Sequence, residues 1–423
     1  MRVLLHSVKV CAPATPHHGS IKDILVENGT IHSIVEGGTA HADKAEVVEG
    51  NGLHVSLGWF DMRASFGEPG NEHREDLRSG AAAAAQGGFT GVLLMPSTRP
   101  ALDSKSGIEF VRRRTEGGLV TIHPAGCITV GGEGNDLAEL YDMWRSGAVA
   151  FTDDQHPLTN AGMLQRALLY CKDFDGRVLV QAEDRHIAGK GQVHEGAVST
   201  RMGLKGIPGL AESVMVSRDL QLLEYTGGSL HFSCISTAAS VELIRRARQQ
   251  GLKVTADVSA LHLYFNEEAM EGFDTHLKVK PPLRAEEDRL ALIDGIKDGT
   301  IGAITSDHRP FDIESKKKEF DLAEFGAAGL ETAFSAAFSA LHGHVPMDRL
   351  IDALAVQPRT ILGLPIPTIA VGSAAELTVF DPAASWRVTA ADLRSKGCNN
   401  PFAGRTLTGR PVAILNKGAF HRI

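Results

Sequence analysis

The chain has no long hydrophobic run, no dense basic segment and few aromatic residues. None of its 423 residues falls in an apolar stretch of about 18, the minimum for a membrane-spanning helix, so we expect no membrane partner. The net charge is -8, and the densest basic run, Arg112-Arg113-Arg114, falls in a probable solvated helix. A nucleic-acid footprint is therefore absent, and the 3 tryptophans and 4 tyrosines form no stacking stripe.

Cysteine is also scarce. The five cysteines are scattered and odd in number, which favours reduced thiols in a cytoplasmic protein; they are Cys11, Cys127, Cys171, Cys234 and Cys398. Residues 1–10 lack a sustained apolar core and a small-residue cleavage site, so they predict a strand rather than a signal peptide.

The composition that remains is that of a globular protein, with 43% hydrophobic and 22% charged residues. Asn28-Gly29 separates two β-like segments, 23–27 and 30–35, and predicts a hairpin with a type I′ turn. Two further β-like segments, 376–381 and 411–416, lie near the other end of the chain. The two ends together, 1–57 and 366–423, are predicted to form one small β-sandwich domain.

Between these ends, strand-like and helix-like segments alternate. Eight Val/Ile/Leu-rich segments predict buried strands, at 59–63, 90–95, 120–124, 148–152, 178–181, 230–235, 254–258 and 303–306. Helical segments separate most of them, at 75–86, 163–171, 210–225, 238–250, 286–296 and 331–341. This order predicts a (β/α)8 TIM barrel over residues 58–365.

Functional residues of such barrels lie at the carboxyl ends of the strands. Here these ends carry Arg63 and Ser65, Ser97, Asp154, Gln181, Cys234, and the pair Asp307 and His308.

At these ends, and along most of the chain, the sequence resembles dihydroorotases of the amidohydrolase superfamily, of the type found beside aspartate transcarbamoylase. The similar segments include Met95-Pro96-Ser97-Thr98, Pro281-Pro282-Leu283-Arg284, Asp307-His308-Arg309-Pro310 and Asn400-Pro401-Phe402-Ala403-Gly404, with residues 68–76, 87–90, 194–196, 203–208, 325–326 and 331–334. The resemblance implies an amidohydrolase-type barrel and, as the family reaction, hydrolysis of a cyclic amide, dihydroorotate, to carbamoyl aspartate in pyrimidine biosynthesis.

The resemblance also implies a metal site, and most of its positions are altered. Its four histidine ligands correspond to Arg63, Ser65, Gln181 and Cys234. The two carboxylates are present: Asp154, which would bridge the metals, and Asp307, ligand and general base in the family. Arginine is permanently cationic and cannot bind a metal ion.

The substrate positions implied by the resemblance are altered as well. Gly67 stands where the family has the arginine that pairs with the substrate carboxylate, and Ser97 and Lys280 stand where it has asparagines. We therefore expect no catalytic residues, with Asp307 a relic base and His308 retained, and no metal cofactor. The one alternative ligand set is Asp154, Cys234 and Asp307, which would hold zinc.

Three functions remain open. The first is a catalytically inactive homologue, not an enzyme, that serves as a structural or regulatory subunit. The resemblance implies that such a subunit assembles with aspartate transcarbamoylase, with further copies of itself, or with both. The second is a zinc-dependent cyclic amidohydrolase with an altered metal site. The third is a small-molecule sensor that kept the pocket.

Weaker site readings are also open. Cys234 is a possible nucleophile with His308 as its base, and Asp154 and Asp307 a possible acid–base pair. The only His-x-His of the chain, His342-Gly343-His344, follows a helix far from any strand end and predicts a surface loop.

Substitution has also brought cations to the strand ends. Because strands one and eight of a closed barrel are neighbours, Arg63 is predicted to reach Asp307 and Asp154 and to occupy the former metal position. Lys280, after strand seven, is the second predicted source of positive charge.

Overall fold

The structure, a computed structural model, describes residues 1–41, 44–397 and 399–423. Eight parallel strands form one sheet in the order β15-β14-β13-β10-β9-β8-β7-β6. They are β6 (Trp59–Ala64), β7 (Phe89–Leu94), β8 (Thr121–Gly126), β9 (Ala150–Phe151), β10 (Val178–Val180), β13 (Leu230–Phe232), β14 (Val254–Ser259) and β15 (Ala303–Thr305). Each falls on one of the eight expected segments, so the predicted barrel is confirmed.

The barrel closes between its first and last strands. The backbone N–H of Ser65 donates to the carbonyl of His308 at 2.8 Å, and the N–H of His308 donates to the carbonyl of Arg63 at 3.2 Å. Below this junction, the buried Asp61 carboxylate accepts a hydrogen bond of 2.7 Å from the Ser306 hydroxyl. The end of β6 is thereby fixed beside the residues that follow β15.

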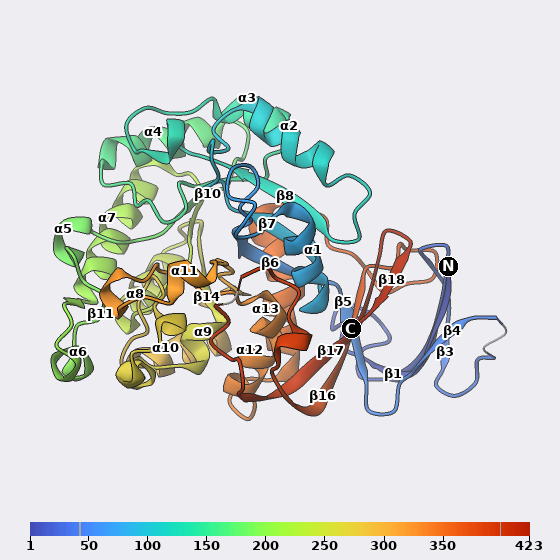
Figure 1. Cartoon of the computed structure of the whole chain (residues 1–423). Helices are drawn as coiled ribbons and strands as arrows, with labels where there is room; N and C mark the ends of the chain where they lie inside the picture. The colour runs from blue at the N-terminus through green and yellow to red at the C-terminus, as the bar shows by residue number, and fades with distance from the viewer. Residues whose placement is uncertain (42–43, 398) are drawn as a thin grey trace.

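Helices surround the barrel (Figure 1). The helices are α1 (Leu77–Gln86), α2 (Lys105–Arg114), α3 (Leu140–Arg145), α4 (Ala161–Lys172), α5 (Arg185–Ala188), α6 (Ala197–Met202), α7 (Leu210–Thr226), α8 (Ala238–Gln249), α9 (Ala260–Tyr264), α10 (Glu286–Asp298), α11 (Ile313–Lys316), α12 (Ala333–Leu341), α13 (Met347–Ala355) and α14 (Gln357–Leu362). Short 3-10 turns cover Val130–Gly132, Glu267–Gly272, Thr275–Leu277, Phe320–Leu322, Leu330–Thr332 and Ala390–Asp392. A two-stranded ribbon, β11 (Val193–His194) with β12 (Gly206–Ile207), lies outside the barrel.

Helix α1 illustrates how local sequence sets these elements. The Asp76 carboxylate caps its first turn by accepting the N–H of Ser79 at 2.7 Å. An alanine-rich segment, which favours helix, follows. The helix stops at Gly87, and Gly88 adopts φ +86°, a conformation that side chains other than glycine rarely take.

Strands from both ends of the chain share a second sheet. Its strands are β1 (Arg2–Val10), β2 (Ile21–Glu27), β3 (Thr30–Glu36), β4 (Glu46–Glu49), β5 (His54–Leu57), β16 (Leu377–Arg387), β17 (Thr406–Asn416) and β18 (Ala419–Arg422). The order is β18-β17-β16-β5-β1-β2-β3, with β4 beside β1, so the two ends meet where β5 pairs with β16. Both termini lie at this sheet (Figure 1).

The predicted hairpin is present in this sheet. β2 and β3 pair antiparallel, and the connecting Asn28 and Gly29 have φ of 49° and 82°, as a type I′ turn requires. The expected strand at the start of the chain is present as β1, Arg2–Val10.

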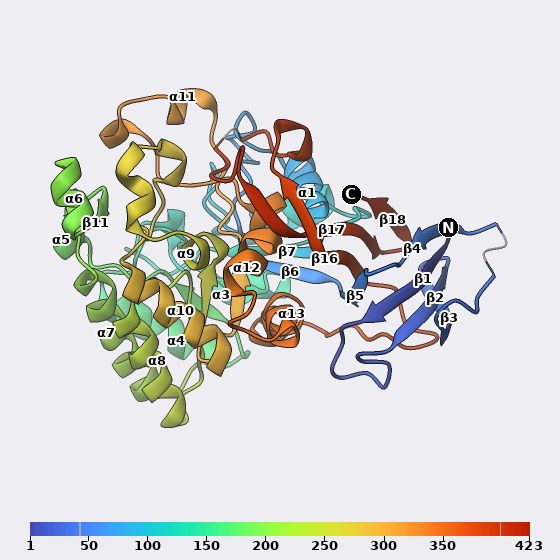
Figure 2. The ribbon, with the colours of Figure 1, turned by 90° about the horizontal axis from the view of Figure 1, so that it is seen from below.

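Aromatic and ionic contacts join the sheet to the barrel. The Trp59 ring, at the start of β6, packs against Phe380 of β16 with 5.5 Å between centroids. Arg359 of α14 donates to the carbonyl of Gly58 at 2.7 Å and pairs with Glu376, next to β16. Seen from below, β16 and β17 run beside α12 (Figure 2).

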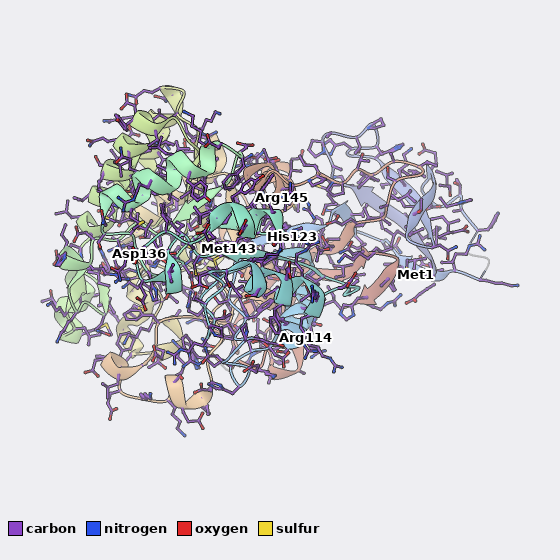
Figure 3. The ribbon with its side chains drawn as sticks, turned by 90° about the horizontal axis from the view of Figure 1, so that it is seen from above. Met1, Arg114, His123, Asp136, Met143 and Arg145 are labelled. Carbon is purple, nitrogen blue, oxygen red and sulfur yellow. The ribbon has the colours of Figure 1, made fainter. Side chains whose placement is uncertain are left out.

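Seen from above, with side chains drawn, Asp136 and Met143 belong to the barrel body and Met1 lies out at the sheet (Figure 3). Within the described ranges, no helix combines the length and the apolar character that crossing a membrane demands. Cys11, Cys127, Cys171 and Cys234 are buried free thiols, and Cys398 lies outside the described residues.

Candidate functional site

A buried guanidinium occupies the centre of the barrel mouth. Arg63, at the end of β6, has a side chain only 2% exposed. Its Nε donates to Asp307 Oδ1 at 2.8 Å, and its Nη2 lies 2.7 Å from Asp154 Oδ1. Nη2 also donates to Gln181 Oε1 at 2.7 Å. The predicted contacts of Arg63 with both carboxylates are thus present, although one nitrogen serves each carboxylate instead of two serving one.

A second arginine, which the sequence analysis did not single out, completes the charge balance. Arg309 pairs with Asp154 Oδ2, and the Ser97 hydroxyl donates to the same oxygen. Two guanidiniums and two carboxylates therefore share the site. Arg309 lies two residues beyond Asp307. Its position just after the eighth strand is the sequence feature that could have identified it as a site residue.

The two carboxylates differ in acidity. Burial opposes the charge of Asp154, but the guanidiniums of Arg309 and Arg63 outweigh it and hold the pKa of this carboxyl well below its usual value. Among the described residues, Asp307 forms an ion pair with Arg63 only, and burial leaves the pKa of its carboxyl raised. Asp307 is consequently the first of the pair to take up a proton as the pH falls.

The backbone at the strand ends is unusual. Asp154, Cys234 and Asp307 have φ of 53°, 52° and 48°, in the left-handed region that costs roughly 1 kcal/mol or more for residues other than glycine. The N–H of Cys234 is held by Asp257 Oδ1 at 2.7 Å, and that of Asp154 by the Thr152 hydroxyl at 3.0 Å. Strain of this kind collects at functional sites, and here three of the sequence-predicted positions carry it.

Cys234 and His308 do not form a nucleophile–base pair. Burial, with the nearby Asp307 carboxylate, raises the pKa of the Cys234 thiol well above its ordinary value, so the thiolate is disfavoured. His308 Nδ1 accepts the backbone N–H of Gly329 at 3.2 Å, and its Nε2 lies 3.5 Å from the Glu75 carboxylate. The polar partners of the His308 ring are therefore Gly329 and Glu75, and Cys234 is not among them.

The remaining predicted residues make contacts other than those expected of metal or substrate ligands. Ser65 contributes its backbone to barrel closure. The prediction that Lys280 supplies charge to the two aspartates is wrong, because its ammonium pairs with Glu183 at 2.7 Å, on the loop after β10. His342 and His344 are exposed after α12, as expected for a surface loop.

Gly67 has no space for a side chain. A Cβ placed there would overlap the backbone carbonyl oxygen of Asn71 and come within 2.8 Å of that of Glu75. These contacts follow from a tight turn in which Gly67 accepts the N–H of Asn71 and donates to Glu75 O. An arginine at this position would require the turn to be rebuilt.

The residues present do not fit a transition-metal ion. No three His, Cys, Asp or Glu side chains in residues 1–41, 44–397 and 399–423 are grouped so as to bind one. The alternative set Asp154, Cys234 and Asp307 therefore fails as a ligand group, since both carboxylates face the Arg63 guanidinium instead.

The protein is a (β/α)8 barrel with this site at its mouth, a fold shared with solved hydantoinase structures. A solved L-hydantoinase (dihydropyrimidinase) from Arthrobacter aurescens matches with a TM-score of 0.85 and 22% identity over 99% of this chain and 95% of that chain. A dihydropyrimidinase from Brevibacillus agri NCHU1002 gives 0.82 at 21% identity, again over 99% and 95% of the two chains. These likenesses support the fold.

Sequence comparison narrows the class to one family. The family described as Dihydro-orotase-like matches residues 54–240. A dihydroorotase from Pelotomaculum thermopropionicum is 42% identical over 399 residues, 94% of this chain and 93% of the relative. One from Syntrophus aciditrophicus is 38% identical over 420 residues, 99% and 98% of the two chains. The chain belongs to the dihydroorotase family.

Replacing Arg63 tests the central ion pairs. Arg63→Met removes the one direct cationic partner of Asp307 while keeping an unbranched apolar stem. We expect a loss of about 3 to 5 kcal/mol in the free energy of unfolding, measured by chemical denaturation. The matched control is Arg201→Met, which breaks the exposed pair with Glu271 and should cost at most about 1 kcal/mol. Equal stability of the two variants would contradict a structural role for Arg63.

Proposed function

We propose that this protein is a non-catalytic member of the dihydroorotase family that serves as a structural or regulatory subunit. The observation that carries this proposal is the Arg63 guanidinium placed between Asp154 and Asp307. A metal ion in such a barrel lowers the pKa of a bound water toward 7 and polarises the carbonyl of the substrate. A guanidinium has no open coordination position, so it supplies charge without generating a nucleophile.

The substrate side supports the same proposal. Gly67 stands where the family resemblance places a substrate-binding arginine, and its turn leaves no room for one. At the other two substrate positions, the Ser97 hydroxyl donates a hydrogen bond to Asp154 and the Lys280 ammonium forms an ion pair with Glu183. Substrate-binding and metal-binding positions have therefore changed together.

The preserved frame argues that the protein still has a role. The barrel and the second sheet are intact, and identity to named dihydroorotases stays near 40% over nearly the whole chain. A scaffold under no constraint would lose such features. Assembly with aspartate transcarbamoylase, implied by the resemblance, or with further copies of this chain would require the outer surface without requiring catalysis.

A second candidate is a cyclic amidohydrolase with an altered metal site. The relatives named dihydroorotase favour it, because sequences at 42% and 41% identity carry that name. Two carboxylates of the site also remain. Activity and metal content separate the two candidates.

The purified protein is expected to show no dihydroorotate turnover in either direction, with or without added zinc. Restoring histidines through the double change Arg63→His and Ser65→His should not recover activity, because Gly67 and Gln181 remain. The matched positive control is an active dihydroorotase assayed in parallel by absorbance. A turnover number within a hundredfold of the ordinary range, roughly 1 to 1000 per second, would sink the proposal.

Metal content gives an independent measurement. Elemental analysis of the protein purified without chelators should find less than about one equivalent of zinc or other transition metal per chain, because a tetrahedral ligand set cannot be assembled. Stoichiometric zinc that disappears in Asp307→Ala would instead favour the second candidate.

Assembly tests the partner. The tagged chain, co-expressed with the aspartate transcarbamoylase of its own organism, should retain that enzyme on affinity resin and elute with it from a sizing column. An active dihydroorotase of unrelated oligomeric type serves as the negative control. If the chain comes off both the affinity resin and the sizing column without the transcarbamoylase, and as a monomer, the subunit role is wrong.

A further inference from the structure

A polar cavity of about 450 Å³ opens above the Arg63 network. Loops that follow several barrel strands contribute its lining, including Arg74, Gln155, Lys280 and Arg309. Arg185, at the start of α5, adds a fourth cation at the rim. The cavity is therefore part of the barrel mouth but lies outside the Arg63 ion pairs.

The side chains that line the cavity include hydrogen-bond donors for which the lining provides no acceptor. The Nε atoms of Arg74 and Arg309 and the Nε2 of Gln155 are buried and have no acceptor among the described residues. Arg74 Nε lies 3.7 Å from Asp312, too far for a hydrogen bond. Lys280 has three N–H groups and one carboxylate partner, Glu183.

Neither carboxylate of the lining removes this surplus. Glu183 is taken up by Lys280, and Glu324 is exposed at the rim. Buried donors without acceptors are costly, so the site is suited to a ligand rich in acceptor oxygens.

Two of the cationic side chains make cation–π contacts with aromatic rings. The Arg74 guanidinium lies 4.8 Å from the centroid of Phe311, and the Lys280 ammonium lies 5.8 Å from that of Phe325. Contacts of this kind hold the cationic groups in place before a ligand arrives and reduce the entropy lost on binding.

We propose that this cavity binds a small polyanion carrying at least two negative charges, either phosphate or carboxylate groups. Its oxygens accept from the Arg309 guanidinium, the Gln155 amide and the Lys280 ammonium, with Arg74 and Arg185 at the entrance. Gly67, the position expected to bind the carboxylate of the family's substrate, does not line the cavity. The proposal goes beyond the subunit role and does not depend on the partner.

Arg309 links the cavity to the buried network. One of its nitrogens pairs with Asp154, while its Nε is among the unsatisfied donors. A bound polyanion therefore holds the guanidinium that also neutralises Asp154, and occupancy should stabilise the folded barrel.

Calorimetric titration and thermal unfolding of the full chain test the proposal with two probes, pyrophosphate and citrate, at matched ionic strength. At least one probe should bind at one site per chain with a dissociation constant below about 1 mM and raise the melting temperature. Tighter binding of pyrophosphate would identify a phosphate-bearing ligand, and tighter binding of citrate a carboxylate. Glycerol, which is neutral, should do neither.

Variants locate the site. Lys280→Gln should weaken binding at least tenfold, and Gln155→Leu, which leaves no charge unpaired, several-fold. Arg201→Gln, at an exposed arginine outside the cavity, should bind like the unaltered chain. Lack of saturable binding by both probes, or equal affinity in Gln155→Leu and the unaltered chain, would overturn the proposal. These measurements do not use turnover or the transcarbamoylase, so their failure is distinct from failure of the subunit role.

Discussion

The Arg63 guanidinium is the interaction on which the barrel mouth depends. Two aspartates, Asp154 and Asp307, lie side by side there with almost no exposure to water. Ionised carboxylates in such a place are costly unless cations and hydrogen bonds compensate them. Arg63 reaches both, and Arg309 adds a second positive charge to Asp154. The site is thus a charge-balanced network within one chain.

In the proposed non-catalytic role, this network keeps the amidohydrolase-type frame charge-balanced without a metal ion. A guanidinium carries its charge at any physiological pH and directs it through fixed N–H groups. The backbone at Asp154, Cys234 and Asp307 is strained, and these strand ends meet at a common centre. The Arg63 guanidinium occupies that centre. Arg309 and Gln155 also line the polar cavity above it.

Most of the fold could be predicted because its signals are local. The buried strands are short runs of Val, Ile and Leu, and the Asn28-Gly29 turn encodes its own backbone conformation. Lengths were less accurate: the expected strand 148–152 is only Ala150–Phe151. Pairing with neighbouring strands sets such boundaries, and the residues of one strand do not encode it.

The sequence by itself determined that Arg63 stands at the end of the first barrel strand, and that a permanent cation there cannot be a metal ligand. It also determined that Arg63 would meet Asp307, because closing a barrel makes its first and last strands neighbours. Only the tertiary structure decided that Arg309 joins Asp154, 155 residues away, and that Lys280 turns to Glu183. Those choices depend on the paths of loops after the strands, which packing across the whole barrel mouth fixes and no local pattern records.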